Sequence, residues 1–241
     1  MYESLAPYLY LLVSVFYSLA IVLLSLVTLP RPGARLTLLS GVIAIPGALL
    51  TIFFEGNYWN PTRLGGLSIG IEDVATNFAA GALAWYGVAL VTGSRLRVFG
   101  TRGESIRRFV ILSSVCLAPF LVGIWLGLDA MSAWLVTCAI TVPLLWLRRP
   151  WMLRLTAIGV PAFTLMWYAA ARLPLWLFPE AARGWSTEVP WGSQVAGVPV
   201  GELVYAVSFG ALWPLFTATV CDTRRLTSGE TATIQSPERR S

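Results

Sequence analysis

Residues 70–83 (GIEDVATNFAAGAL) and residues 199–212 (PVGELVYAVSFGAL) are similar and align without a gap. Each stretch opens a long apolar segment with an acidic residue, and the alignment places Asp73 on Glu202. An acidic side chain at membrane depth is costly and usually functional. Two such residues at equivalent positions predict a chain built from two structural repeats that share one site.

The composition is typical of a protein that crosses a membrane several times. Of the 241 residues, 56% are hydrophobic and 12% are charged, and the mean hydropathy is +0.71. A soluble domain carries roughly 25% charged residues. Seven apolar segments are close to the roughly 20 residues that a helix needs to cross a bilayer. The predicted spans are 6–29, 36–54, 70–92, 109–127, 130–147, 152–172 and 199–220.

The predicted fold is an all-α polytopic membrane protein with two parallel three-helix repeats and a connecting helix. Residues 1–92 form the first repeat, residues 93–128 the connecting helix and residues 129–220 the second repeat. The polar residues 221–241 are expected to form a disordered cytoplasmic tail. Residues 173–198 are rich in Trp and Pro and are expected to lie along the membrane interface.

The arginines predict the orientation of the chain. All 17 basic residues are Arg, and fourteen of them flank the predicted spans on one side. Only Arg63, Arg172 and Arg183 lie on the other side. Because basic residues gather on the cytoplasmic side, the N-terminus is expected outside the cell membrane and the C-terminus in the cytoplasm. The two acidic helix starts then lie at the outer face, on helices that run in the same direction.

The chain contains neither Lys nor His, and this excludes several kinds of site. A retinal protein needs a Lys for its Schiff base, and lysine-based covalent catalysis is excluded with it. Imidazole metal ligands and His general bases are also absent. Cys116, Cys138 and Cys221 lack metal-ligand spacing and are expected to be small buried residues. We predict no metal, no cofactor and no nucleic-acid partner, because the net charge of +5 belongs to the loops beside the membrane.

In the last span, aromatic residues follow Glu202 on one helical face. Tyr205, Phe209 and Trp213 lie three, seven and eleven positions after it. This spacing places all of them beneath the carboxyl group. Aromatic faces attract desolvated cations by about 2 kcal/mol or more, so this face is a candidate wall for a positively charged intermediate.

The third span presents a different face below Asp73. Asn77, Gly81 and Ala84 share this side of the helix and are polar or small. Such a face leaves room for a ligand or for a neighbouring helix. Together the two faces predict a slot with acids at its mouth and aromatic walls below. Gly81 and its equivalent, Gly210, are expected to be packing contacts.

Such a slot suits a long apolar substrate with an end that must be protonated. A carboxyl group in apolar surroundings favours its protonated form and can give its proton to a carbon–carbon double bond. Aromatic faces then stabilise the carbocation without trapping it. Ring closure and loss of a proton to a second base complete a reaction without redox change.

Structural explanations stay open for each of these residues. The helix dipole and capping favour acids in a first turn, which would account for the acids at both helix starts. The aromatic face could instead pack in the core or against lipid, and Asn77 could bond a neighbouring helix. Arg63 either pairs with a nearby carboxylate or faces lipid headgroups.

Several of these motifs resemble the lycopene cyclase domain, the integral-membrane type of carotenoid cyclase that occurs as heterodimers or fusions. The matching residues of the first half are 58–63 (YWNPTR), 65–67 (GGL) and 70–74 (GIEDV). They are similar to the family's aromatic-x-x-Pro-x-Arg loop, its Gly-rich turn and its Pro-x-Glu-Glu motif. Residues 197–202 (GVPVGE) are similar to the motif of the second module. The resemblance implies two homologous helical modules.

The resemblance also implies an activity, the proton-initiated and redox-neutral closure of the ends of lycopene to ionone rings. Its paired acids correspond to Glu72 and Asp73 in the first half and to Glu202 alone in the second. Gly70 stands where the family has Pro, and Gly201 replaces the first acid of the second motif. The chain is therefore identified as a divergent member.

We predict an intramembrane isoprenoid cyclase, an isomerase, in which Asp73 and Glu202 donate and accept the proton in either order and Glu72 tunes them. The predicted substrate-binding residues are Arg63, Asn77, Tyr205, Phe209 and Trp213. The predicted partners are an apolar polyene and the lipid bilayer, and a homo-oligomer or a carotenoid-pathway protein stays open as a further partner. The alternative is a non-catalytic membrane protein that binds a carotenoid or prenyl lipid, or assembles with a partner.

Overall fold

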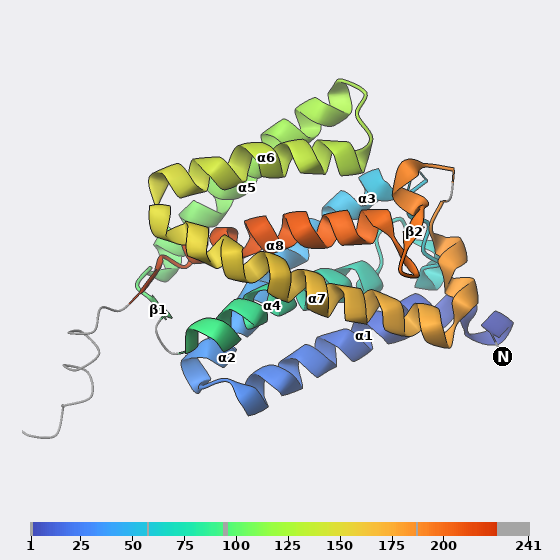
Figure 1. Ribbon diagram of the computed structural model, residues 1–241, viewed down its shortest axis with the longest axis horizontal. Helices are drawn as coiled ribbons and strands as arrows, with labels where there is room; N and C mark the ends of the chain where they lie inside the picture. The colour runs from blue at the N-terminus through green and yellow to red at the C-terminus, as the bar shows by residue number, and fades with distance from the viewer. Residues whose placement is uncertain (1, 57, 94–95, 187, 226–241) are drawn as a thin grey trace, which may run out of the picture.

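The computed structural model describes residues 2–56, 58–93, 96–186 and 188–225, and they form a bundle of long helices (Figure 1). In this part of the chain, seven helical segments are long and apolar enough to cross a membrane. They confirm the predicted all-α architecture and indicate a multi-pass membrane protein. The segments are Tyr8–Thr28, Arg31–Phe54, Ile71–Thr92, Arg102–Trp125, Ala130–Arg148, Pro150–Leu177 and Val200–Val220.

The α-helices are α1 (Tyr2–Thr28), α2 (Arg31–Ala44), α3 (Thr51–Phe54), α4 (Ile71–Thr92), α5 (Arg102–Trp125), α6 (Ala130–Arg148), α7 (Leu153–Leu177) and α8 (Val200–Val220). The 3-10 helices are η1 (Ile45–Leu50), η2 (Leu64–Gly66), η4 (Pro150–Met152), η5 (Pro179–Gly184) and η6 (Pro190–Gly192). Strand β1 (Leu96–Val98) pairs with β4 (Thr223–Arg225), and β2 (Gln194–Val195) pairs with β3 (Val198–Pro199). Because α2, η1 and α3 follow one another without a break, together they form the second span.

Helix caps move some span boundaries away from the predicted ones. Helix α5 begins well before the predicted residue 109, because Thr101 and Glu104 cap it reciprocally through bonds of 3.2 and 3.4 Å. Helix α2 begins at Arg31, before the predicted residue 36, because Pro30 has an extended backbone and is the N-cap residue. Helix α7 continues to Leu177, so the segment expected at the interface from residue 173 starts as helix.

Helices α4 and α8 occupy the centre of the bundle. In an apolar stretch of 18 residues within each span, 56% and 61% of the residues are buried, against 17% in the corresponding stretches of α1 and α5. Helix α4 packs on α1, α2 and α7, and helix α8 packs on α6, α7 and α4. We call the end that holds the first turns of α4 and α8 the acidic end, and the end that holds β1 and β4 the arginine-rich end.

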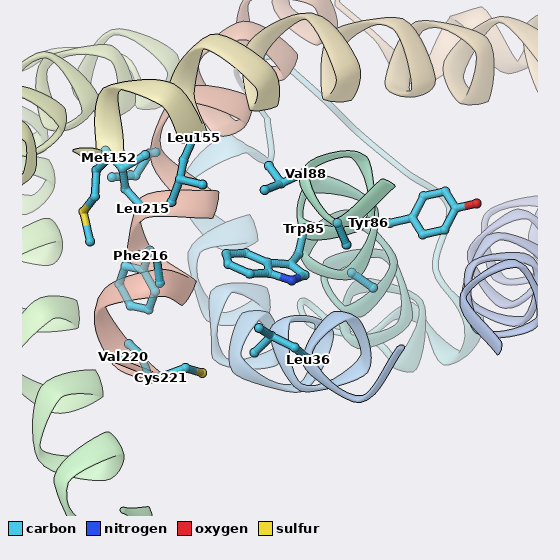
Figure 2. Packing of buried hydrophobic residues seen from close by; sticks show 14 of the residues in the cluster. Leu36, Trp85, Tyr86, Val88, Met152, Leu155, Leu215, Phe216, Val220 and Cys221 are labelled. Atoms are coloured by element: carbon cyan, nitrogen blue, oxygen red, sulfur yellow. The ribbon is translucent and has the colours of Figure 1, made fainter. Parts of the chain in front are cut away.

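A cluster of buried side chains holds the central helices together. Figure 2 shows the Trp85 ring in the middle of this cluster, with Leu36 of α2 on one side and Leu155 and Leu215 on the other. Tyr86 points away toward α1, where its hydroxyl lies 2.9 Å from the hydroxyl of Thr28. The core thus fixes α4 against its neighbours, and the polar pair fixes α1 against α4.

At the arginine-rich end, the start of the expected tail belongs to the fold. Strand β4 pairs with β1, while residues 226–241 of the predicted tail lie outside the described residues. Asp222 is buried and lies 2.8 Å from Arg149, 3.0 Å from Arg224 and 3.6 Å from Arg108. Burial alone would raise the pKa of Asp222, but hydrogen bonds from Arg224 and Arg149 hold it below its ordinary value. Its φ of 47° is a left-handed conformation that Asp tolerates better than most residues.

We predict that Asp222→Ala lowers the free energy of unfolding by about 2–3 kcal/mol, because it loses charged hydrogen bonds and strains the backbone. Asp222→Asn keeps the backbone preference and removes only the charge, so its loss is smaller. Because the pKa of Asp222 is lowered by folding, its contribution is complete above about pH 4 and is lost as the pH falls further. Thermal unfolding in detergent checks both points. The difference in melting temperature between wild type and Asp222→Asn should become smaller only below about pH 4.

Candidate functional site

A large apolar cavity lies inside the bundle and is connected to the acidic end. Its volume is about 860 Å³, and residues of α1, η1 and of α4 to α8 line it. Among the described residues on its wall, Glu202 is the only carboxyl group. An apolar pocket with few convergent polar groups is the usual form of a small-molecule site.

Three neutral donors surround the carboxyl group of Glu202. Its Oε1 accepts hydrogen bonds from the Tyr58 hydroxyl at 3.1 Å and from Trp185 Nε1 at 3.0 Å. Its Oε2 accepts one from Trp167 Nε1 at 2.9 Å. None of the ion pairs in the described part of the chain involves Glu202. Burial and the nearby Glu202 raise the pKa of Tyr58 well above its ordinary value, so this hydroxyl stays a proton donor.

Gly201 allows this arrangement. A side chain at this position would collide with the ring of Tyr58, which reaches past residue 201 to Glu202. The absence of a side chain at residue 201 is therefore coupled to the position of Tyr58.

Below Glu202 the aromatic side chains of α8 form a continuous stack on the cavity wall. The ring centroids of Tyr205 and Phe209 are 5.1 Å apart, and those of Phe209 and Trp213 are 5.0 Å apart with an interplanar angle of 7°. Trp213 is also held by a 2.9 Å hydrogen bond from its Nε1 to Ser40 Oγ. The structure places all three predicted aromatic residues on the cavity, as the helical spacing indicated.

Asp73 has different surroundings and does not face the cavity. It is fully buried, and Arg63 binds it through Nε at 2.7 Å and Nη2 at 3.3 Å. The backbone N–H of Gly70 donates to its Oδ2 at 2.8 Å and the Tyr10 hydroxyl to its Oδ1 at 3.0 Å. Asp73 thus caps α4 and neutralises an arginine, so Asp73 and Glu202 do not converge on one slot.

Arg63 and Glu72 also lie away from the cavity wall. Burial lowers the pKa of Arg63, but Asp73 and then Glu55, 3.0 Å from Nη1, together raise it above its ordinary value. Glu72 is fully buried, and its Oε1 accepts the backbone N–H of Leu64 at 2.6 Å. Both side chains fix the loop before α4. Of the two roles left open for Arg63, the structure therefore shows pairing with carboxylates and not contact with lipid headgroups.

Asn77 is the one polar residue of the predicted α4 face that lines the cavity. Its Nδ2 donates to the backbone carbonyl of Asp73 at 2.9 Å. A Cβ atom added at Gly47 would lie only 2.8 Å from Asn77 Oδ1, so the glycine lets η1 pack closely on Asn77 of α4. Asn77 therefore connects the capped start of α4 with the cavity.

Sequence analysis missed Tyr58, Trp167 and Trp185 as partners of Glu202. Tyr58 comes from the loop before α4 and Trp185 from the segment expected at the membrane interface, and the two loops bond each other across the acidic end. Asn60 N–H donates to Gly184 O at 2.7 Å, and Ser186 N–H donates to Tyr58 O at 3.0 Å. The sequence does hold one usable signal. Trp167 and Trp185 precede Glu202, and a buried indole N–H usually has a hydrogen-bond partner.

Comparisons with protein-family models, with curated proteins and with solved structures found no match for this chain. No group of three or more Asp, Glu, Cys or His residues in the described ranges is placed to hold a metal ion. The functional argument therefore depends on the geometry around Glu202.

We predict that Trp185→Phe lowers the free energy of unfolding by about 1 kcal/mol, because the half-buried carboxyl group of Glu202 loses one of its three donors. The loss should shrink in a Glu202→Met background, where the indole N–H has no carboxylate to bind. Thermal unfolding of the four proteins in this cycle gives the coupling between the two side chains. Trp125→Phe, at a position that is 83% exposed, is the control and should change little. Equal losses in both backgrounds would contradict the hydrogen bond.

Proposed function

We propose that this chain is an intramembrane isoprenoid cyclase of lycopene cyclase type, which closes the end of a lycopene-like polyene. The observation that carries the proposal is Glu202, a single carboxyl group on an apolar cavity with a stacked aromatic wall. The resemblance of residues 58–74 and 197–202 to the lycopene cyclase domain supports the same chemistry.

The proposed reaction uses Glu202 as acid and then as base. Its protonated carboxyl group gives a proton to the terminal double bond, and a tertiary carbocation forms. A second double bond attacks this cation and closes the ring, while the faces of Tyr205, Phe209 and Trp213 stabilise the positive charge. The carboxylate of Glu202 then removes a proton beside the new cation. The delivered proton stays on the product and a different proton restores the carboxyl group of Glu202, so the reaction needs neither oxidant nor cofactor.

In this proposal the two similar helix starts divide the work. Asp73 binds Arg63 and so holds the loop that carries both Arg63 and Tyr58. This pair lies away from the cavity, and Asp73 takes no part in the reaction. Glu202 has only neutral donors and faces the space where a substrate would lie. Glu72 is assigned to positioning the same loop.

We also propose the repeat and the orientation that the sequence predicts. Helix α4 packs on α1 and α2 as α8 packs on α6 and α7. A side chain at Gly81 would collide with the Ser40 carbonyl of α2, and one at Gly210 with the Gly159 carbonyl of α7. These equivalent close contacts support two parallel repeats joined by α5. The excess of Arg in the loops of the arginine-rich end supports a cytoplasmic location for that end, in the cell membrane.

A second candidate is a non-catalytic protein that binds a carotenoid or prenyl lipid. One observation favours it: no second carboxyl group accompanies Glu202 on the described cavity wall. The same cavity would hold such a ligand without changing it. The two candidates differ in whether the ligand is recovered unchanged.

We predict that expression in a lycopene-accumulating host yields ring-containing products, which chromatography with absorption spectra identifies. Glu202→Gln should lower conversion by about 10²-fold or more, the usual contribution of a general acid, while the protein still accumulates in the membrane. Glu188→Gln, an exposed acid, is the control and should convert lycopene normally. Unchanged lycopene with the wild-type protein would contradict the carotenoid version, and an active Glu202→Gln would contradict the role of Glu202.

We predict that Arg63→Met destabilises the protein by about 3–5 kcal/mol, because it leaves the buried carboxylate of Asp73 without its arginine. Asp73→Asn should cost less, because Arg63 keeps its ion pair with Glu55. The double variant should recover much of the Arg63→Met loss, since both charges are then gone. Thermal unfolding and product analysis of all three variants check this. If Asp73→Asn abolishes product while Arg63→Met, which breaks the same pair, does not, Asp73 takes part in the reaction and the single-acid mechanism is wrong.

A further inference from the structure

The cavity reaches the side of the bundle between α1 and α7. Phe16, Leu24 and Leu173 line it there and have exposed fractions of 58%, 48% and 40%. Helix α1 packs on α4 and α2, and helix α7 packs on α8 and α4, so α1 and α7 flank α4 without an extended contact between them. This opening lies within two apolar spans and faces the hydrocarbon of the bilayer.

The route from the aqueous side is covered. The loops that carry Tyr58 and Trp185 are bonded to each other across the acidic end. Tyr58 is only 5% exposed, and Trp59 packs edge-to-face on Tyr10 of α1 with centroids 5.0 Å apart. A ligand for Glu202 can therefore approach through the groove between α1 and α7, which the cavity reaches.

One hydrogen bond crosses this groove. The Tyr17 hydroxyl of α1 donates to the Ala170 carbonyl of α7 at 2.5 Å. In an α-helix this carbonyl would accept from the N–H of residue 174, but Pro174 has none. A carbonyl without a partner is costly in a membrane, where no water can bind it. Tyr17 thus closes the groove at the place where α7 leaves an acceptor free. Between residues 8–28 of α1 and α7, it is the only side-chain hydrogen bond that the structure describes.

We infer that the groove between α1 and α7 is the access path and the chain-binding subsite for a long linear isoprenoid that enters from the bilayer. Its end reaches Glu202, and its remaining chain lies along Phe16 and the small residues 169–171. The Tyr17–Ala170 bond breaks to admit the chain. A long apolar chain fits because the opening is apolar and faces lipid, whereas a polar ligand would have to cross the covered acidic end. The inference goes beyond the proposed reaction, since it holds equally for a ligand that is bound and not converted.

The test places a reporter thiol behind the groove. Ala79→Cys lies on the cavity wall of α4, in a full-length protein in which Cys116, Cys138 and Cys221 are replaced by Ala. The protein is reconstituted in lipid vesicles and treated with a long-chain alkyl maleimide, which dissolves in the bilayer, or with a sulfonated maleimide, which does not. The alkyl reagent should label the thiol at least tenfold faster than the sulfonated one.

Tyr17→Phe should speed labelling by the alkyl reagent by about fivefold, the factor that corresponds to the loss of one hydrogen bond. Tyr168→Phe is the matched control, because it removes a tyrosine bond to the Ala196 carbonyl outside the groove, and it should label at the parent rate. Lycopene in the vesicles should slow the alkyl reagent in every variant.

Equal labelling of Tyr17→Phe and the parent protein, or equal rates for the two reagents, would overturn the inference. If Ala79→Cys does not accumulate, Leu83→Cys on the same wall repeats the test. Labelling does not depend on conversion, so a failed cyclase assay leaves this result standing, and a failed labelling assay leaves the cyclase proposal standing.

Discussion

Arg63 and Asp73 form a buried ion pair on which the acidic end of the bundle depends. The pair connects the loop before α4 to the first turn of that helix, at 2.7 Å and with both side chains out of solvent. Such a pair is costly to break, because the partner that remains would be a buried unpaired charge. Through this loop the pair positions Tyr58 and Trp59 over the cavity. The surroundings of Glu202 therefore depend on an ion pair in which Glu202 takes no part.

The two acidic helix starts are alike in sequence and unlike in surroundings. At the first, an arginine and a backbone N–H bind the carboxylate, and it serves as a cap. At the second, Gly201 leaves space for Tyr58, and two indoles complete a set of neutral donors. Gly201 is thus the residue that lets Tyr58, from the loop before α4, reach Glu202 at the start of α8. Asymmetry between the halves is built into the site.

Helical periodicity predicted which side chains share a face, and long-range contacts decided what each face meets. The seven spans and the aromatic face of α8 could be predicted, because hydropathy and a 3.6-residue period are local properties. The role of Asp73 could not be predicted, since it depends on how far Arg63 reaches from a loop. Tyr58 and Trp185 were missed because a loop that folds over a helix end has no periodic signal. Trp167 was missed because its position on α7 does not show that it meets the first turn of α8.

The central claim is that a proton from Glu202 starts ring closure inside the apolar cavity. The most direct measurement is the mass of the product formed from lycopene by the membrane-reconstituted protein in deuterated water. If the Glu202 carboxyl group exchanges with solvent and then protonates the polyene, each ring closed carries one deuterium on carbon, and Glu202→Gln forms no labelled product. A cyclic product without deuterium, or a labelled product from Glu202→Gln, would contradict the account.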